Sequence, residues 1–394
     1  MYYKSLTIPG GAERLFLKEY EYFLEMGYDV YVIVNKINSL NLNTKEIDKK
    51  RLIIIDKRFP FSIFKLATKI RQLGKPFVLC SSGDIDIYLA SLFTKFIYAL
   101  HIHHPIYMSF NDYDKYSIFL KKWFKKYIKS NYGAARFLNL SNELTTTKKI
   151  KLNFRAFFSI KAKRKAKKTF VLSRFSKKEK LDLYKISSDV LYGAIENNSV
   201  NLSVKNKKNN FRIFTVARLD INKRIDILIK TVYELIKKEK KIELIIAGEG
   251  PERAKLEELI NELGMKKFVK LIGFISDDML SDEFRRADIF ITIDWADYKI
   301  SMFEALAHGV PVIVSNETEC DLRLIKSKYV MRSLPKVKSL EKIISLYMDN
   351  RLHINKNEIK NILDEYTWSN YFYKIAMSLS NKGLISAPSN KYDK

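Results

Sequence analysis

Short apolar runs alternate with longer segments of helical spacing through the second half of the chain. Strands are predicted at 213–216, 243–247, 269–272, 289–293 and 312–314, and helices near 224–238, 251–263, 277–287 and 301–308. A repeat of strand followed by helix is typical of a parallel sheet with helices on both faces. We therefore expect a doubly wound α/β domain in this half of the chain.

The first half shows the same alternation less regularly. A helix is predicted at 12–26 and strands at 29–34, 52–55, 77–80 and 96–102, which indicates a second parallel sheet. Only one short strand fits before Pro9, and a chain start that is incomplete would explain why. A polar stretch at 197–210 is the best candidate for a linker, and a helical pattern resumes at 359–379. We expect domains at 1–196 and 197–358, followed by a last helix and tail at 359–394.

Composition fits this organisation. The chain has 394 residues, of which 47% are hydrophobic and 29% are charged, values typical of a globular protein with room for two cores. No apolar stretch approaches the ~20 residues of a membrane span, and no signal peptide opens the chain. Cys80 and Cys320 are too few and too far apart for a disulfide framework. These observations predict a cytoplasmic protein.

The charge is the unusual feature, because 71 basic residues against 44 acidic ones give a net +27. Such a balance predicts an anionic partner, and no nucleic-acid-binding motif accompanies it. Residues 118–129 combine an aromatic stripe with five lysines, which favours an interfacial helix on an anionic membrane. The alternative is a domain helix that packs its stripe inward. In either case a basic face with 161–168 could contact lipid head groups.

The stretch 293–315 reads as strand, loop, short helix and strand. A loop that enters a helix N-terminus presents unpaired N–H groups that, with the helix dipole, bind anions. Ser301 and Glu304 permit two interpretations. They form a capping box, or the Glu304 carboxylate accepts hydrogen bonds from the hydroxyl groups of a ribose. In the second interpretation, the N–H groups that hold a diphosphate are those of Lys299, Ile300, Ser301 and Met302.

Two cations lie at the edge of the same predicted sheet. Arg218 and Lys223 occupy the turn between the strand at 213–216 and the next helix. They suit a diphosphate, because a guanidinium binds two oxygens at once and an ammonium acts as a point charge. The alternative is ordinary surface charge on a basic protein.

Histidine and glycine mark two further points in the first half. His101, His103 and His104 follow a predicted strand without a nearby carboxylate or cysteine, so a metal site is the less favoured interpretation. Gly10 and Gly11 precede the first helix, where glycine lets backbone approach a ligand closely; a simple turn is the alternative.

The sequence Glu304-Ala-Leu-Ala-x-Gly-x-Pro resembles the motif of the retaining GT-B glycosyltransferases of family 4, the glycosyl transferases group 1. Arg218 with Lys223, and Gly248-Glu-Gly-Pro, resemble further motifs of that family in the same order. The resemblance spans nearly the whole chain and is most specific at 211–316. It implies two Rossmann-like domains that face a cleft, the first binding the acceptor and the second the nucleotide-sugar.

The resemblance also implies roles for single residues. Arg218 and Lys223 would grip the donor diphosphate and take part in catalysis, and Glu304 would hold the ribose. The loop with Gly10 and Gly11 would approach the donor phosphates. His103 matches a histidine near the donor sugar in many relatives, with His104 as its competitor and a structural histidine as the alternative.

This sequence departs from the family pattern in the loop before Glu304. The family carries a Glu-x7-Glu motif, but the first position is Ala296 here, with Asp297 beside it as the candidate substitute in donor binding. Lys299 replaces the small residue usual in that loop. The half of the motif that touches the transferred sugar is therefore altered.

These observations predict a hexosyltransferase-type enzyme that moves a sugar from a nucleotide-diphosphate-sugar to an acceptor with retention. A lipid-linked or cell-surface glycan precursor is the expected acceptor, with peripheral contact on the inner face of an anionic membrane. We expect no metal and no cofactor, since the nucleotide-sugar is a substrate. The alternatives are a non-catalytic or truncated family member and a sugar-nucleotide epimerase of the same fold.

Overall fold

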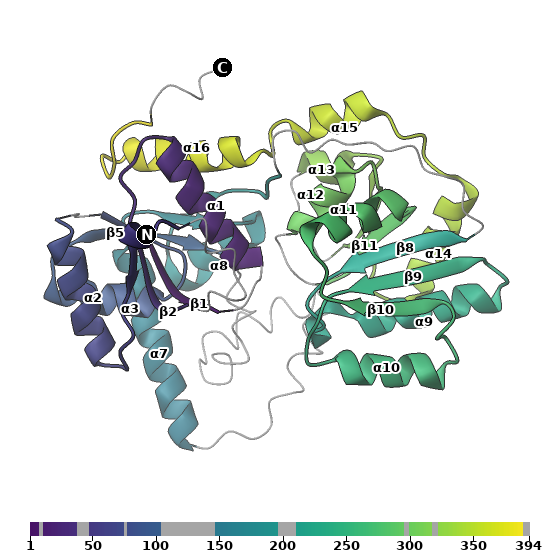
Figure 1. Cartoon of the computed structure of the whole chain (residues 1–394), viewed down its shortest axis with the longest axis horizontal. Coiled ribbons are helices and arrows are strands. Elements are labelled where there is room, and N and C mark those ends of the chain that lie inside the picture. The colour runs from purple at the N-terminus through teal and green to yellow at the C-terminus, as the bar shows by residue number, and fades with distance from the viewer. Residues whose placement is uncertain are drawn as a thin grey trace. The chain divides into compact units, whose positions relative to one another are not determined.

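The computed structural model describes residues 1–7, 11–37, 47–74, 77–103, 146–195, 210–294, 299–316 and 322–388. The chain divides into two compact units (Figure 1). The described parts of 1–103, 146–192 and 368–388 form the first unit, and those of 193–367 form the second. Three segments far apart in the sequence thus build the first unit.

The first unit contains a parallel sheet of seven strands in the order β3-β2-β1-β4-β5-β6-β7. The strands are β1 (Tyr2–Leu6), β2 (Val32–Ile37), β3 (Leu52–Ile54), β4 (Phe77–Cys80), β5 (Ile97–Ile102), β6 (Thr169–Val171) and β7 (Asp189–Val190). The short first strand of the prediction is β1, which lies in the middle of the sheet between β2 and β4.

Helices cover both faces of this sheet. They are α1 (Gly11–Glu25), α2 (Phe61–Gln72), α3 (Asp84–Phe93), α7 (Thr146–Lys165), α8 (Arg174–Tyr184) and α16 (Trp368–Ser380), with a 3-10 turn at Lys49–Arg51. Leu66 of α2 and Ile87 of α3 are fully buried in the core against Val78 of β4. On the other face α1 contacts α16, where the rings of Tyr22 and Phe372 are 5.2 Å apart.

The second unit contains a parallel sheet of six strands in the order β10-β9-β8-β11-β12-β13. The strands are β8 (Phe211–Val216), β9 (Ile242–Ala247), β10 (Val269–Gly273), β11 (Ile289–Thr292), β12 (Val312–Ser315) and β13 (Val330–Ser333). The helices are α9 (Ile225–Lys237), α10 (Arg253–Glu262), α11 (Asp277–Arg286), α12 (Ile300–Ala307), α13 (Leu322–Lys326), α14 (Val337–Asp349) and α15 (Lys356–Leu363), with a 3-10 turn at Ile221–Lys223.

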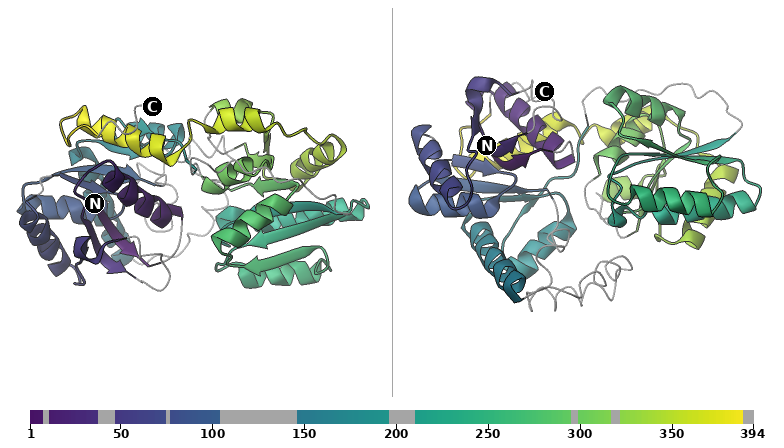
Figure 2. Two further views of the ribbon diagram at one scale, coloured as in Figure 1. Left: turned by 45° about the horizontal axis from the view of Figure 1, so that its top comes forward. Right: turned by 60° about the horizontal axis from the view of Figure 1, so that its bottom comes forward.

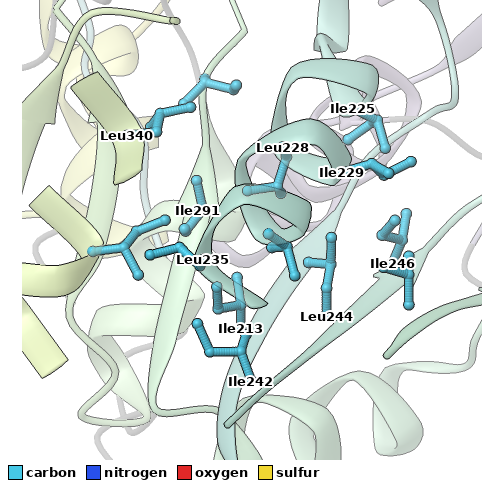
Figure 3. Close-up of a cluster of buried hydrophobic side chains, with 14 of the residues drawn as sticks. Ile213, Ile225, Leu228, Ile229, Leu235, Ile242, Leu244, Ile246, Ile291 and Leu340 are labelled. Carbon is cyan, nitrogen blue, oxygen red and sulfur yellow. The ribbon is translucent and has the colours of Figure 1, made fainter. Parts of the chain in front are cut away.

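Strand alternation distributes apolar side chains to both faces of this second sheet. Leu228 and Leu235 of α9 pack on the face that carries Ile213 (Figure 3). The next residue, Phe214, points to the opposite face, where its ring lies 5.3 Å from that of Phe284 on α11. Helices therefore lie on both faces (Figure 2), and the predicted doubly wound parallel architecture is confirmed.

The structure corrects several predicted bounds. The helical pattern at 359–379 forms two helices, α15 and α16, rather than one. The chain between them makes a sheet-like contact, in which Ile195 N donates to Tyr366 O at 2.8 Å, and this interrupts the helix. Strand β13 and helix α14 were not predicted. The expected amphipathic helix at 118–129 lies outside the described residues.

Within the described residues, no helix combines the length and the apolar character that crossing a bilayer requires.

Candidate functional site

The order of strands in the second sheet reverses between β8 and β11. From β8 the sheet continues through β9 to β10, and from β11 it continues through β12 to β13. Open α/β sheets bind ligands at such a switch point, outside the carboxyl ends of the strands. The loop after β8 carries Arg218 and Lys223, and the chain after β11 leads to Lys299 and α12. The topology thus brings two separately predicted segments to one edge.

Asp294 joins these two segments. Lys223 Nζ lies 2.5 Å from Asp294 Oδ2, and Lys299 Nζ contacts Asp294 Oδ1. Thr292 Oγ1 donates to the same Oδ1 at 3.2 Å. The Asp294 and Lys299 side chains are both only 3% exposed. Two ammonium groups therefore share one buried carboxylate at the switch point.

Arg224 is a third cation close to this carboxylate in the fold. It is buried, its backbone is left-handed with φ 54°, and its Nη1 donates to Ile293 O at 2.9 Å. Its guanidinium is therefore bonded to the backbone of the residue that precedes Asp294. Burial lowers the pKa of Lys223 to about 8, and the negative charge of Asp220 offsets part of this shift.

Arg218 differs from the buried cations in its exposure. It lies in the loop directly after β8, and its side chain is 63% exposed. Its Nε lies 3.1 Å from Asp220 Oδ2, a contact that orients the guanidinium. Arg218 is therefore the cation of this site that is most accessible to a ligand.

The glycines after β9 support the loop that carries Arg218. A Cβ at Gly248 would lie 2.0 Å from Ala217 O, and a Cβ at Gly250 would lie 2.5 Å from Leu219 O. Leu219 N donates to Glu249 O at 2.9 Å, which fixes the two loops together. Glycine is required here because backbone packs directly on backbone.

Helix α12 begins one residue earlier than predicted. Its first helical residue is Ile300, and its N-cap is Lys299, which makes no side-chain capping bond. Ser301 is therefore inside the helix, and the capping-box interpretation of Ser301 and Glu304 is wrong. Met302 N donates to Lys299 O at 3.2 Å, so the amides of Ile300 and Ser301 are the ones left at the helix start.

Glu304 lies in the second turn of α12, where its residue is partly exposed. One neighbour, His308, contacts the other end of this short helix. His308 Nδ1 lies 2.8 Å from Glu304 O, and burial lowers the pKa of this imidazole.

The histidines predicted in the first unit have different surroundings. His103 follows β5, is 8% exposed, and sets its ring edge-on to His101 at 4.4 Å. His101, which was not a candidate, is completely buried and lies 2.9 Å from Glu19 Oε1 and 2.8 Å from the Tyr371 hydroxyl. His101 thus ties β5 to α1 and α16.

The remaining predicted residues are only partly described. Gly11 is the first residue of α1. Gly10, His104, Ala296 and Asp297 lie outside the described residues. Asp294 and Arg224 are the site residues that sequence reasoning missed, although Asp294 lies within the stretch 293–315 and Arg224 directly follows Lys223.

Comparison with known proteins decides the family. Residues 199–362, which include the switch-point residues, match the family model of glycosyl transferases group 1. This part of the chain belongs to the glycosyl transferases group 1. The family contains nucleotide-sugar-dependent glycosyltransferases, as the resemblance implied.

Curated relatives match part of this group 1 chain. An uncharacterized glycosyltransferase of Methanocaldococcus jannaschii is 28% identical over 183 residues, which cover 43% of this chain and 46% of the relative. The alpha-monoglucosyldiacylglycerol synthase of Acholeplasma laidlawii is 28% identical over 114 residues, 29% of this chain and 28% of the relative. Each match thus spans less than half of the relative's own length.

Solved structures match the chain over almost its full length. The Anabaena protein HepE, solved with UDP and glucose, has a TM-score of 0.69 at 15% identity and covers 96% of this chain and 98% of its own. At this identity the likeness shows the fold alone. The group 1 chain therefore has the GT-B fold that the sequence predicted.

Proposed function

We propose that this group 1 chain transfers a sugar, of hexose type, from a nucleotide-diphosphate-sugar to an acceptor with retention of configuration. The observation that carries the proposal is the cluster in which Asp294 joins Lys223 to Lys299 at the switch point, beside the N-terminus of α12. Cations and a helix N-terminus at one point suit a diphosphate.

The chemistry follows from where charge develops. When the bond between the anomeric carbon and the diphosphate breaks, negative charge grows on the departing nucleoside diphosphate. In this proposal Arg218, Lys223 and the first amides of α12 stabilise that charge, and they act more strongly on the transition state than on the ground state. We assign Arg218 and Lys223 to this role.

The same segment supplies the remaining donor contacts of the proposal. Glu304, on α12, would accept hydrogen bonds from ribose hydroxyls, as its match to the family motif implies. The Lys299 ammonium would contribute positive charge near the diphosphate from below the N-terminus of α12, since its side chain is turned into the protein and is 3% exposed. Asp297, beside Ala296, remains the candidate for contact with the sugar.

We propose that the predicted domain 1–196 binds the acceptor and that the predicted domain 197–358 binds the donor. His103 directly follows β5, and Gly11 begins the helix that follows β1, so both lie beyond the carboxyl ends of strands, where ligands of such sheets bind. His103 would act near the transferred sugar and Gly11 near the donor phosphates.

The acceptor in this proposal is a lipid-linked or cell-surface glycan precursor, met on the cytoplasmic face of an anionic membrane. The net charge of +27 supports it, because anionic lipid attracts a basic protein. A relative named as an alpha-monoglucosyldiacylglycerol synthase supports a lipid acceptor as well.

The experiment measures release of free nucleoside diphosphate from UDP-, GDP- and ADP-sugars, with and without a membrane lipid extract. We expect release from one donor, stimulation by lipid, and at least a tenfold loss in Arg218→Ala. Arg285→Ala is the matched control, because Arg285 also pairs with an aspartate on the surface of the second unit but lies on α11. Its release should equal that of the unaltered chain.

Other outcomes select the alternatives. Conversion of the donor sugar to its epimer without an acceptor would replace the proposal by an epimerase. If a folded protein releases no nucleoside diphosphate from any donor, the proposal is replaced by that of a non-catalytic family member. Ala296→Glu then tests whether the missing carboxylate is the cause.

A further inference from the structure

An exposed aromatic face lies on the first unit, away from the motifs discussed above. Helices α2, α3 and α7 lie next to one another on the unit (Figure 1). Large apolar side chains that are 40% to 69% exposed gather at one end of α2 and α3. We call this the aromatic face and define it as Phe59, Phe61, Phe64, Leu92, Phe93 and Ile97.

The aromatic face joins two helices through a direct ring contact. The rings of Phe64 on α2 and Phe93 on α3 are 4.6 Å apart. The same helix α2 buries Ile63 and Leu66 in the core, so its phenylalanines are additional to the residues that hold it in place. Contiguous exposed apolar patches on a folded unit mark interaction sites.

Helix α7 packs beside α3 but does not extend the aromatic face. Helices α3 and α7 each lead back to the start of the next parallel strand, so they run in the same direction, and Asp84 at the start of α3 pairs with Lys163 at 2.5 Å. Phe154 and Phe157, both more than half exposed, precede Lys163 and therefore lie beyond the start of α3, away from Phe93. The aromatic face is thus confined to α2, the end of α3 and the start of β5.

The charges around the aromatic face are of one sign. The segment 57–83 contains six basic residues and no acidic one, and α7 contains no acidic residue. The acids of α3 are engaged, because Asp84 pairs with Lys163 and Asp86 with Lys4 at 2.8 Å. Exposed Lys57, Arg58 and Lys95 flank the phenylalanines.

We propose that the aromatic face is the surface by which this protein sits on an anionic lipid bilayer. Phenylalanine and leucine enter the boundary between head groups and acyl chains, while flanking lysine and arginine contact anionic head groups. A second copy of the chain fits less well, because a symmetric contact would bring the two basic rims together.

The role of this surface, which is to bring the protein to a lipid-linked acceptor, rests on the proposed function. The experiment that tests the surface does not. Binding to vesicles is measured without donor or turnover. If vesicle binding holds while donor turnover fails, the donor assignment is wrong and the membrane surface stands.

The first experiment compares vesicle binding of the full chain and a triple variant, Phe61→Ser with Phe64→Ser and Phe93→Ser. On vesicles of phosphatidylglycerol and phosphatidylcholine at physiological salt, we expect the triple variant to bind at least tenfold more weakly. Phe274→Ser is the matched control, because Phe274 is 70% exposed but belongs to the second unit. Its binding should stay within about twofold of the unaltered chain.

Two single, conservative substitutions provide a second test in case the triple variant does not fold. Phe61→Trp should shift its emission to the blue on anionic vesicles and be quenched by brominated lipid, whereas Phe274→Trp should not. Equal quenching at the two positions, or unchanged binding by the triple variant, would overturn the proposal. A dimer that the triple substitution dissociates would assign the face to a second copy and overturn it equally.

Discussion

Asp294 carries a single negative charge between two ammonium groups, and its carboxylate is almost completely buried. A lysine at a helix N-cap is electrostatically unfavourable, because the helix start is itself positive. Asp294 offsets that cost for Lys299 and at the same time holds Lys223 in the turn between β8 and α9. One carboxylate thus holds two positively charged ammonium groups close together at the switch point.

Replacing Asp294 by Asn should destabilise the second unit by about 3 kcal/mol, because removing one partner of a buried ion pair leaves the other charge uncompensated. Urea unfolding measures this change. Asp282→Asn is the control, since Asp282 pairs with Arg285 on an exposed helix surface and should cost less than about 0.5 kcal/mol. Equal effects of the two substitutions would contradict the role given to Asp294.

The pKa of Lys223 is lowered by burial to about 8, so we predict that donor binding depends on pH. A diphosphate binds the charged ammonium, so its affinity should be level near pH 7 and fall about tenfold per pH unit above about 8. Calorimetric titration with nucleoside diphosphate over this range measures it. Lys223→Arg should remove the fall, because arginine stays charged; an identical pH dependence in that variant would show that another group titrates.

The sequence predicts some of the individual site residues and not others. Arg218 and Lys223 were found because they lie in a turn between a strand and a helix and match a family motif. Asp294 was missed because its partners are 71 and five residues away in the chain, at Lys223 and Lys299. Pairing over such separations leaves no local pattern.

Among the elements, the turn after β9 shows how one segment positions another. Its glycines let Ala217 and Leu219 approach backbone to backbone, and hydrogen bonds complete the contact. The loop that presents Arg218 is therefore held from behind by a neighbouring strand end. Rigid support of this kind is what a precise binding geometry needs.

Gly250→Ala should disturb this support, because the new Cβ would lie 2.5 Å from Leu219 O. We expect a loss of about 2–4 kcal/mol in the free energy of unfolding and at least tenfold weaker nucleotide binding. Gly264→Ala provides the control, since Gly264 has φ 67° but nothing within 4 Å of the added Cβ. It should cost about 1 kcal/mol and leave nucleotide binding unchanged. Undisturbed nucleotide binding in Gly250→Ala would show that the loop does not depend on this turn.

The strands of the second sheet could be predicted because burial on both faces makes them continuous apolar runs. Strand β13 was missed, since its Val-Met-Arg-Ser sequence mixes apolar and polar residues at the edge of the sheet. The start of α12 was misplaced because Ser301 looks like a cap, whereas Lys299 holds that position through its pairing with Asp294. Tertiary contact overrode local preference in both cases.

For the whole molecule, the sequence predicted an anionic partner from charge alone and placed the membrane contact on basic segments. The structure adds an aromatic face that the sequence did not reveal, because a phenylalanine within a helical pattern reads as core. Whether Phe61 and Phe64 are buried depends on which side of α2 the sheet covers. The two units thus combine a proposed donor site with a proposed membrane surface.

The central claim is that the switch point of the second sheet holds the diphosphate of a nucleotide-sugar. Its most direct test is calorimetric titration of the full chain and of Arg218→Ala with UDP, GDP and ADP. The account predicts that one of them binds, and that Arg218→Ala weakens its binding at least tenfold, the effect of losing a charge-assisted hydrogen bond. Absence of binding for all three, or equal binding by Arg218→Ala, would contradict it.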